Sequence, residues 1–351
     1  MNTHTQTRGR KLLSVILSAL LIAALSLSAA ACWEDNTPQN GQSPSGTGTE
    51  GGLIIVTSMF ASYDFARTLA DEVAEISLLV PPGAETHSYE PTPSDIILLN
   101  SADVFIYVGG ESDAWLDKII DSLENPHLTL VRLTDLVETV DEVALEGMTV
   151  PDEEHSSTEG SEAEEDAGSK EEEHEDETDE HVWTSLRNAQ IIVDALADTF
   201  AELDADNAQL FHDNAQNLNR ELSALDKHIT DIVSSAERTT FVFGDRFPFR
   251  YFADDYGLTS YAAFPGCSTA VDTNPSTITF LIDIVRKENI PVIFTIELSN
   301  GRIAQTIAAE TSAQILCFHS VHNISEEDLR AGATYLSLMQ ENADNLEVAL
   351  N

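Results

Sequence analysis

Short apolar runs recur along the chain from Gly52 onward, separated by stretches in which apolar residues repeat every three or four positions. Apolar runs between turn residues are typical of buried strands, and the longer spacing is typical of amphipathic helices. The runs predict strands over residues 53–57, 76–80, 104–108, 128–133, 241–243, 260–264, 292–296 and 315–318. The amphipathic pattern predicts helices over residues 62–74, 92–102, 115–123, 248–256, 278–287, 303–311 and 326–350.

Strands that alternate with helices form βαβ units, in which the sheet is parallel and both faces are covered. The alternation occurs once in each half of the chain, so we expect an α/β fold of two Rossmann-like lobes with parallel sheets. Ligands of such folds bind beyond the carboxyl ends of the strands. The cleft between the two lobes is therefore the expected binding site.

The segment from Trp183 to about Ala236 has a helical pattern throughout. Its apolar residues form two stripes, Ile191, Ile192, Ala195, Leu196 and Phe200, followed by Leu218, Leu222, Leu225, Ile229 and Ile232. This pattern predicts a long, rigid linking helix between the lobes.

The N-terminus has the pattern of an export signal. Basic residues precede an apolar stretch from Leu12 to Leu27, and small residues then lead to Cys32. This order resembles a bacterial lipobox, which predicts a signal peptide over 1–31 and lipidation of Cys32 on the extracytoplasmic face of the cell membrane. A transmembrane anchor is the alternative, although the apolar stretch is short for a span. Residues 32–51 are polar and rich in glycine and serine, which predicts a flexible tether.

The composition narrows the choice of partners. The chain has 351 residues and a formal net charge of −44, with a pI of about 4.2. Such a charge repels phosphates, so we expect no nucleic-acid partner and membrane contact only through the lipid anchor. Sixteen of the residues 151–180 are acidic, and we expect this segment to be a solvated loop.

The remaining boundaries are an N-terminal lobe over 52–182, a linking helix over 183–237 and a C-terminal lobe over 238–351.

The cysteines leave two interpretations open. Three cysteines are too few for a disulfide scaffold. If Cys32 is lipidated, Cys267 and Cys317 remain, and an exported protein permits a disulfide between them. Two buried thiols are the alternative.

Candidate metal ligands lie where predicted strands end or helices begin. His87 follows the second strand, His181 closes the acidic segment, Asp245 follows the fifth strand, and His319 and His322 follow the last strand. A metal held by residues from both lobes needs this arrangement. His155 and His174 lie within the acidic loop, where they either collect metal ions weakly or simply belong to a solvated tether.

Several motifs resemble the zinc- and manganese-type solute-binding lipoproteins of ABC importers. They are GAETHSYEPTPSDIILLNSADVFIYVG, DEHVWTS at the end of an acidic loop, FRYFADDYGL, FPGCS, TIELSNGRIAQTIAAET and GATYLSLMQENADNLEVAL. The resemblance runs from about Leu53 to the C-terminus. It implies a monomeric protein that holds one divalent metal ion in the cleft and delivers it to a permease and its ATPase.

The resemblance also implies a ligand set. His87 and His181 match the family's first two ligands, and His322 aligns with the fourth, with His319 in reserve. A strict count places Arg246 at the third position, but a one-residue bulge would place Asp245 there. Three imidazoles and one carboxylate suit Zn²⁺, whereas Mn²⁺ prefers more oxygen ligands.

Two other functions are alternatives to metal delivery. A surface adhesin would use the metal only to stabilise its fold. An exported zinc hydrolase would need a general base, for which Glu297 is the candidate. We expect no enzyme, because the sequence has no HExxH, GxSxG or SxxK motif.

Overall fold

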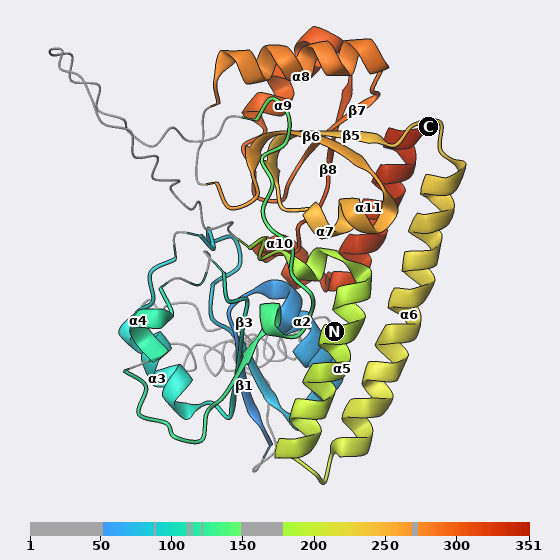
Figure 1. The fold of residues 1–351 in the computed structure, drawn as a ribbon. Coiled ribbons are helices and arrows are strands. Elements are labelled where there is room, and N and C mark those ends of the chain that lie inside the picture. The colour runs from blue at the N-terminus through green and yellow to red at the C-terminus, as the bar shows by residue number, and fades with distance from the viewer. Residues whose placement is uncertain are drawn as a thin grey trace, which may run out of the picture. The chain divides into compact units, whose positions relative to one another are not determined.

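Two parallel sheets of four strands each organise the described part of the chain (Figure 1). The computed structural model describes residues 52–87, 89–110, 113, 115–120, 122–148, 178–268 and 273–351. The signal segment, Cys32, the tether, and both His155 and His174 lie outside the described residues. Within the described helices, no segment combines the length and hydropathy that a membrane span requires.

The first sheet has the strand order β2-β1-β3-β4, and every neighbouring pair is parallel. Ile55 on the central strand is paired with Ile76 on one side and Val104 on the other. The order reverses direction between β1 and β3, which is where ligands of doubly wound sheets bind. The strands are β1 (Ile54–Thr57), β2 (Glu75–Leu78), β3 (Val104–Tyr107) and β4 (Thr129–Arg132).

The second sheet repeats this order as β6-β5-β7-β8, again all parallel. The pairing of β5 with β6 shifts register between Phe243 and Arg246. The expectation of two α/β lobes with parallel sheets is therefore confirmed. The strands are β5 (Thr240–Phe247), β6 (Thr259–Pro265), β7 (Val292–Thr295) and β8 (Gln314–Cys317).

Helices cover both faces of each sheet, as βαβ units require. The expected helices are present, with ends that differ by a few residues from the expected ranges. Helix α3 begins at the expected Thr92-Pro93, where the Asp95 carboxylate accepts a hydrogen bond from the Thr92 backbone amide at 2.6 Å. The lobe helices are α2 (Phe60–Ala70), α3 (Pro93–Ser101), α4 (Asp117–Ile120), α7 (Arg250–Tyr256), α8 (Pro275–Glu288) and α9 (Arg302–Thr311).

One hydrophobic core is shared by the inner faces of the two sheets. Alternate residues of a strand point to opposite faces, so Ile55 joins the shared core while Val56 packs toward α3. In the second sheet Phe243 joins the shared core, while Val242 packs toward α8 and α9. Because both sheets contribute to one core, the lobes are held together by apolar burial as well as by hydrogen bonds.

The expected single linking helix is wrong in one respect: it is two helices packed against each other. Helix α5 (Leu186–Leu203) ends before a turn, and α6 (Ala208–Ser235) then runs alongside it (Figure 1). The turn is stabilised by Asp204, whose carboxylate accepts hydrogen bonds from Asn207 at 2.7 and 3.3 Å. Aspartate and asparagine favour such local bonds over helix continuation. The buried face of α5 also differs from the first expected stripe. Ile191, which belongs to that stripe, is exposed, whereas Val193 and Ala197 are buried.

The expected C-terminal helix over 326–350 is also divided. Helix α10 (Glu326–Ala331) ends at Gly332, whose φ of +83° suits glycine, and α11 (Tyr335–Leu350) follows. The last segment packs on the first lobe as well as the second. Arg67 of α2 donates to the Ala333 carbonyl at 2.9 Å, and α11 contacts both α2 and α6.

Candidate metal centre

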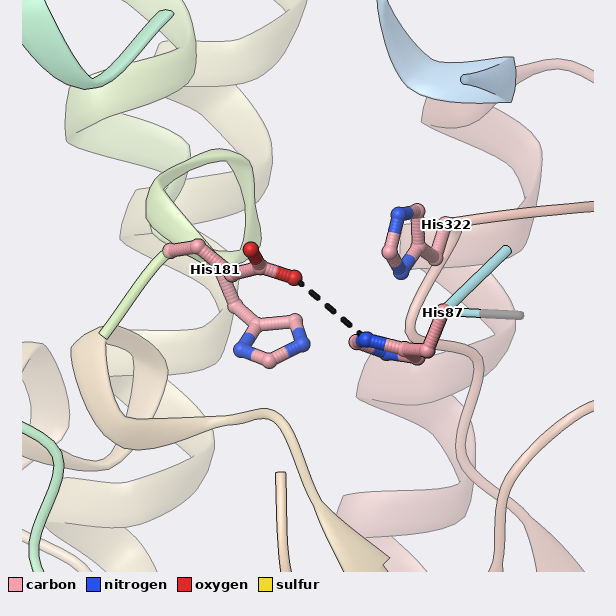
Figure 2. A group of neighbouring side chains, drawn as sticks. His87, His181 and His322 are labelled. Atoms are coloured by element: carbon pink, nitrogen blue, oxygen red, sulfur yellow. Dashed lines mark ion pairs between the residues drawn. The ribbon is translucent and has the colours of Figure 1, made fainter. Parts of the chain in front are cut away.

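Four side chains meet between the two sheets: His87, Glu180, His181 and His322. Each offers one ligand atom, and these atoms all lie within 4.8 Å of one another. Figure 2 shows the three imidazole rings around a common centre, with centroids 5.2–6.1 Å apart. All four side chains are almost completely buried. The segments that carry His87 and His322 follow the carboxyl ends of β2 and β8, where this fold binds ligands.

His87 is positioned by the loop after β2. Gly83 in this loop has a φ of +81°, which glycine tolerates, and its amide donates to the Ile324 carbonyl at 2.8 Å. The loop thereby brings His87 into the cleft, where its Nδ1 lies 3.7 Å from Oε1 of Glu180 (Figure 2, dashed line).

Glu180 and His181 share a tight turn at the start of the linking segment. The Val182 amide donates to the Glu180 carbonyl at 2.8 Å, and His181 has φ and ψ of −80° and 41°, as in an inverse γ-turn. This turn allows two adjacent side chains to reach the same centre. His181 Nδ1 lies 3.1 Å from the Asp179 carboxylate, which directs the other ring nitrogen, Nε2, away from Asp179.

His322 is oriented by the loop after β8. The preceding Val321 has a φ of +58°, an unusual conformation for a β-branched residue. His322 Nδ1 lies 3.3 Å from the Thr86 hydroxyl, and its carbonyl accepts a hydrogen bond from the Phe60 amide at 3.0 Å. The loop is therefore held against the first lobe, and the other ring nitrogen is available to the centre.

The protonation of the three imidazoles follows from burial and from neighbouring charges. Burial lowers the pKa of His87 to about 3, with His181 and Arg246 acting in the same direction. Burial also lowers the pKa of His322, again helped by His87 and His181. Burial lowers the pKa of His181 too, but the hydrogen bond and charge of Asp179, with Glu180 and Glu142, outweigh it, so its pKa is raised. Two of the three imidazoles are therefore neutral at pH 7, as a metal ligand must be.

Among the four residues of this group, two buried ring nitrogens have no hydrogen-bond partner in the described part of the chain, His87 Nδ1 and His181 Nε2. Buried polar atoms are normally satisfied, so a pair of such atoms facing one centre indicates a ligand. The cavity beside them measures about 30 Å³, which is room for little more than one water molecule or one ion.

Two glycines allow the backbone to approach these ligands. A Cβ on Gly266, in the FPGCS motif, would lie 2.9 Å from Cε1 of His181. A Cβ on Gly110 would clash with Oε2 of Glu180. The turn that carries Gly110 is held by the buried Asp113, which accepts hydrogen bonds from the Val108 and Gly109 amides at 2.6 and 3.1 Å.

The structure brings together three of the four residues expected from the sequence, His87, His181 and His322, and places Glu180 beside them. Asp245 is not part of the group. The register shift in β5 is present near the expected bulge, but the Asp245 carboxylate accepts a hydrogen bond from the Arg246 amide at 2.9 Å instead. Burial raises the pKa of Asp245.

His319, the reserve ligand, lies outside the group as well. Its Nε2 is 3.5 Å from Glu341, and its Nδ1 is 3.8 Å from the sulfur of Cys317. The structure has no disulfide between Cys267 and Cys317, and both side chains are half-buried rather than fully buried. Burial raises the pKa of Cys317, which makes its thiol unreactive.

Glu180 is the residue that sequence reasoning missed. Glu180 is the last residue of the segment expected to be a solvated loop. In an extended chain the side chains of neighbouring residues point in opposite directions, so Glu180 and His181 are not expected to face the same centre. The γ-turn that overcomes this has no clear sequence signal. A carboxylate directly before a ligand histidine is the only feature that could have indicated it.

Comparisons with known proteins identify the family to which the chain belongs. A profile of the family described as "Zinc-uptake complex component A periplasmic" matches residues 55–349. The zinc-binding lipoprotein AdcA of Streptococcus pneumoniae serotype 4 is 29% identical over 298 residues, which cover 85% of this chain and 56% of AdcA. The high-affinity zinc uptake system protein ZnuA of Bacillus subtilis is 27% identical over 340 residues, covering 94% of this chain and 96% of ZnuA.

A solved structure extends the likeness to three dimensions. The Zn(II)-bound ZnuA-like domain of Streptococcus pneumoniae AdcA superposes with a TM-score of 0.67 at 26% identity, covering 86% of this chain and 99% of that domain. The chain therefore spans about half the length of the streptococcal relatives and matches their ZnuA-like part.

Proposed function

Since this chain belongs to the family of periplasmic zinc-uptake complex component A, we propose that it binds Zn²⁺ outside the cytoplasm and delivers it to an ABC importer. The observation that carries the proposal is the buried group of three imidazoles and one carboxylate. The named relatives bind zinc or belong to a zinc uptake system, which supports the same cargo.

The ligand chemistry favours zinc over manganese and magnesium. Zn²⁺ takes nitrogen and oxygen ligands at about 2.0–2.2 Å in tetrahedral geometry, so its ligand atoms lie about 3.3 Å apart. The present atoms lie within 4.8 Å of one another, so shortening these separations by up to about 1.5 Å would close the site around the ion. Mn²⁺ and Mg²⁺ prefer more oxygen ligands than the single carboxylate of this group supplies.

We propose a role in binding rather than in catalysis. Catalytic zinc keeps an open position for water, with three protein ligands, whereas this group supplies four. Glu297, the candidate base of a hydrolase, accepts hydrogen bonds from the Ser320 amide and hydroxyl. This use of its oxygens supports a structural role in holding the loop that carries His322.

Delivery needs attachment near a permease and its ATPase. We propose that Cys32 carries the lipid, that residues 32–51 tether the lobes to the membrane, and that a monomer presents the loaded cleft to the permease. The name of the pneumococcal relative, a zinc-binding lipoprotein, supports the anchor.

A zinc titration of protein purified without metal tests the proposal. We expect one tightly bound Zn²⁺ per chain, and its loss in His87→Ala, His181→Ala and His322→Ala. The exposed His127, which lies far along the chain from this group, supplies the control variant His127→Ala. Zinc-limited growth that depends on the wild-type gene and fails with His181→Ala would support delivery. Unchanged zinc binding in all three ligand variants would contradict the proposed site.

A further inference from the structure

An ion pair joins the two lobes beside the metal centre. Arg246 on β5 of the second lobe donates from both terminal nitrogens to the two carboxylate oxygens of Glu85, each at 3.2 Å. Glu85 lies on the loop after β2 of the first lobe. Arg246 also donates to the Ser268 carbonyl at 3.4 Å. A two-pronged arginine–carboxylate pair fixes orientation as well as distance.

This pair lies between the metal centre and solvent. Glu85, Arg246 and the three histidines line the same small cavity. The side chains of His87 and Glu180 are 6% and 1% exposed, whereas those of Arg246 and Glu85 are 18% and 46% exposed. Exposure therefore rises from the ligand group to the ion pair, which places the pair at the mouth of the cavity.

Three of the four residues of the metal centre lie before the second sheet in the chain, and the fourth, His322, lies on the loop after β8 of that sheet. His87 is in the first lobe, and Glu180 and His181 precede α5. His322 follows β8, but its loop is hydrogen-bonded to the first lobe, where Asn323 also donates to the Pro81 and Ala84 carbonyls at 3.0 and 2.7 Å. The second lobe therefore contributes one ligand, His322, and through Arg246 it also contacts the loop that carries His87.

We propose that the Glu85–Arg246 ion pair is a gate that must open before the metal ion leaves the cavity. The inference rests on the proposed function, because it concerns the release of the same cargo. The gate retains the ion without ligating it: the guanidinium cannot coordinate a cation, and the Glu85 carboxylate is occupied by Arg246. Residence time then depends on two residues outside the ligand group.

Zinc release measures the gate directly. Zinc-loaded protein is mixed rapidly with excess chelator, and the dissociation rate is compared among wild type, Glu85→Gln, Arg246→Gln and the double variant. A partly exposed pair is worth up to about 1 kcal/mol, so we expect each single variant to release zinc about three- to fivefold faster. Because one interaction is removed in every case, the double variant should match the single variants.

The control is Arg250→Gln, which removes a similarly exposed ion pair with Asp254 on α7 and should leave the rate unchanged. The gate would be overturned if both single variants released zinc at rates within twofold of wild type. It would also be overturned if the rate increases of the two single variants multiplied in the double variant. An equilibrium titration of the same wild-type protein separates the two proposals. Absence of zinc binding there would overturn the proposed function, whereas tight binding with unchanged release rates overturns only the gate.

Discussion

Two of the three imidazoles of the metal centre, those of His181 and His322, are oriented by a partner on one of their two nitrogens. Asp179 lies against Nδ1 of His181, and the Thr86 hydroxyl lies against Nδ1 of His322. A partner on one ring nitrogen fixes the tautomer and directs the other nitrogen at the metal. The ligand set therefore depends on residues that do not touch the ion.

The identity of the fourth ligand gives the first prediction. Glu180→Gln removes the only carboxylate of the group and should lower zinc affinity at least tenfold, because a neutral amide binds Zn²⁺ far more weakly than a carboxylate. Asp245→Asn is the matched control and should change affinity less than threefold. Competition with a zinc-sensitive dye measures both, and a larger loss in Asp245→Asn would reverse the assignment.

Asp179 gives a second prediction at this scale. Asp179→Asn removes the charge that raises the pKa of His181, and it weakens the orientation of the ring. We expect zinc affinity at pH 7.5 to fall about 10- to 100-fold, the usual cost of losing a carboxylate partner of a metal-ligating histidine. Asp141→Asn, at the nearby bridge with Thr178, serves as the control. Equal affinities in Asp179→Asn and wild type would show that this partner has no role.

Three of the four residues could be predicted from the sequence because each stands at a strand end or a helix start. Glu180 could not, since its contribution depends on a γ-turn whose hydrogen bond joins residues two apart. Asp245 stays a prediction from the sequence, and it lies outside the group of four side chains. The irregularity in β5 exists, but Arg246 rather than Asp245 lines the cavity.

Among the elements, the strands were predictable and the interruptions of helices were not. Buried runs such as 104–108 and 292–296 match β3 and β7 within a residue or so, because strands covered on both faces are apolar throughout. The turn after Leu203 and the break at Gly332 interrupt patterns whose apolar spacing continues on both sides. Periodicity alone does not detect such a break, and only the Asp-Asn and glycine residues mark it.

Gly266 gives a prediction at the scale of the loop after β6. Gly266→Ala would place a Cβ 2.9 Å from the His181 ring and 3.1 Å from the Phe247 carbonyl. We expect the His181 ring to be displaced and zinc affinity to fall about tenfold or more. A ligand that moves by a few tenths of an ångström no longer has the distance and direction that coordination requires.

The control is Gly332→Ala, where a Cβ meets nothing within 4 Å but the φ of +83° is strained. This variant should lose about 1 kcal/mol of unfolding free energy and keep wild-type zinc affinity. Chemical denaturation together with zinc titration separates the two effects. Equal zinc affinities in Gly266→Ala and wild type would contradict the close contact with His181.

At the scale of the whole molecule, metal binding and folding stability are linked through the buried histidines. The two sheets share one core, so His87 and His322 are buried only when both lobes are in place. Their pKa values are lowered in the folded protein. Below pH 6.5 these two imidazoles bind protons in the unfolded chain but stay neutral in the folded protein. Protonation therefore favours the unfolded state, and the free energy of unfolding falls as pH decreases.

This linkage predicts a pH dependence for the metal-free protein. The folded pKa of His87 is about 3, so its contribution is lost between pH 6.5 and about 3. Relative to His87→Gln, wild type should lose about 1.4 kcal/mol of unfolding free energy per pH unit as pH falls below 6.5. The raised pKa of His181 acts in the opposite direction, but it is present in both proteins and cancels. Urea unfolding at pH 7.5, 6 and 5 tests this, and parallel pH profiles would contradict it.

The proposed zinc site is tested by a crystal structure of the zinc-loaded protein with anomalous diffraction at the zinc absorption edge. We expect one strong peak coordinated by His87, Glu180, His181 and His322, with the Glu85–Arg246 ion pair closed over it. A zinc ion coordinated by Asp245 or His319, or a peak away from the three histidines, would contradict it.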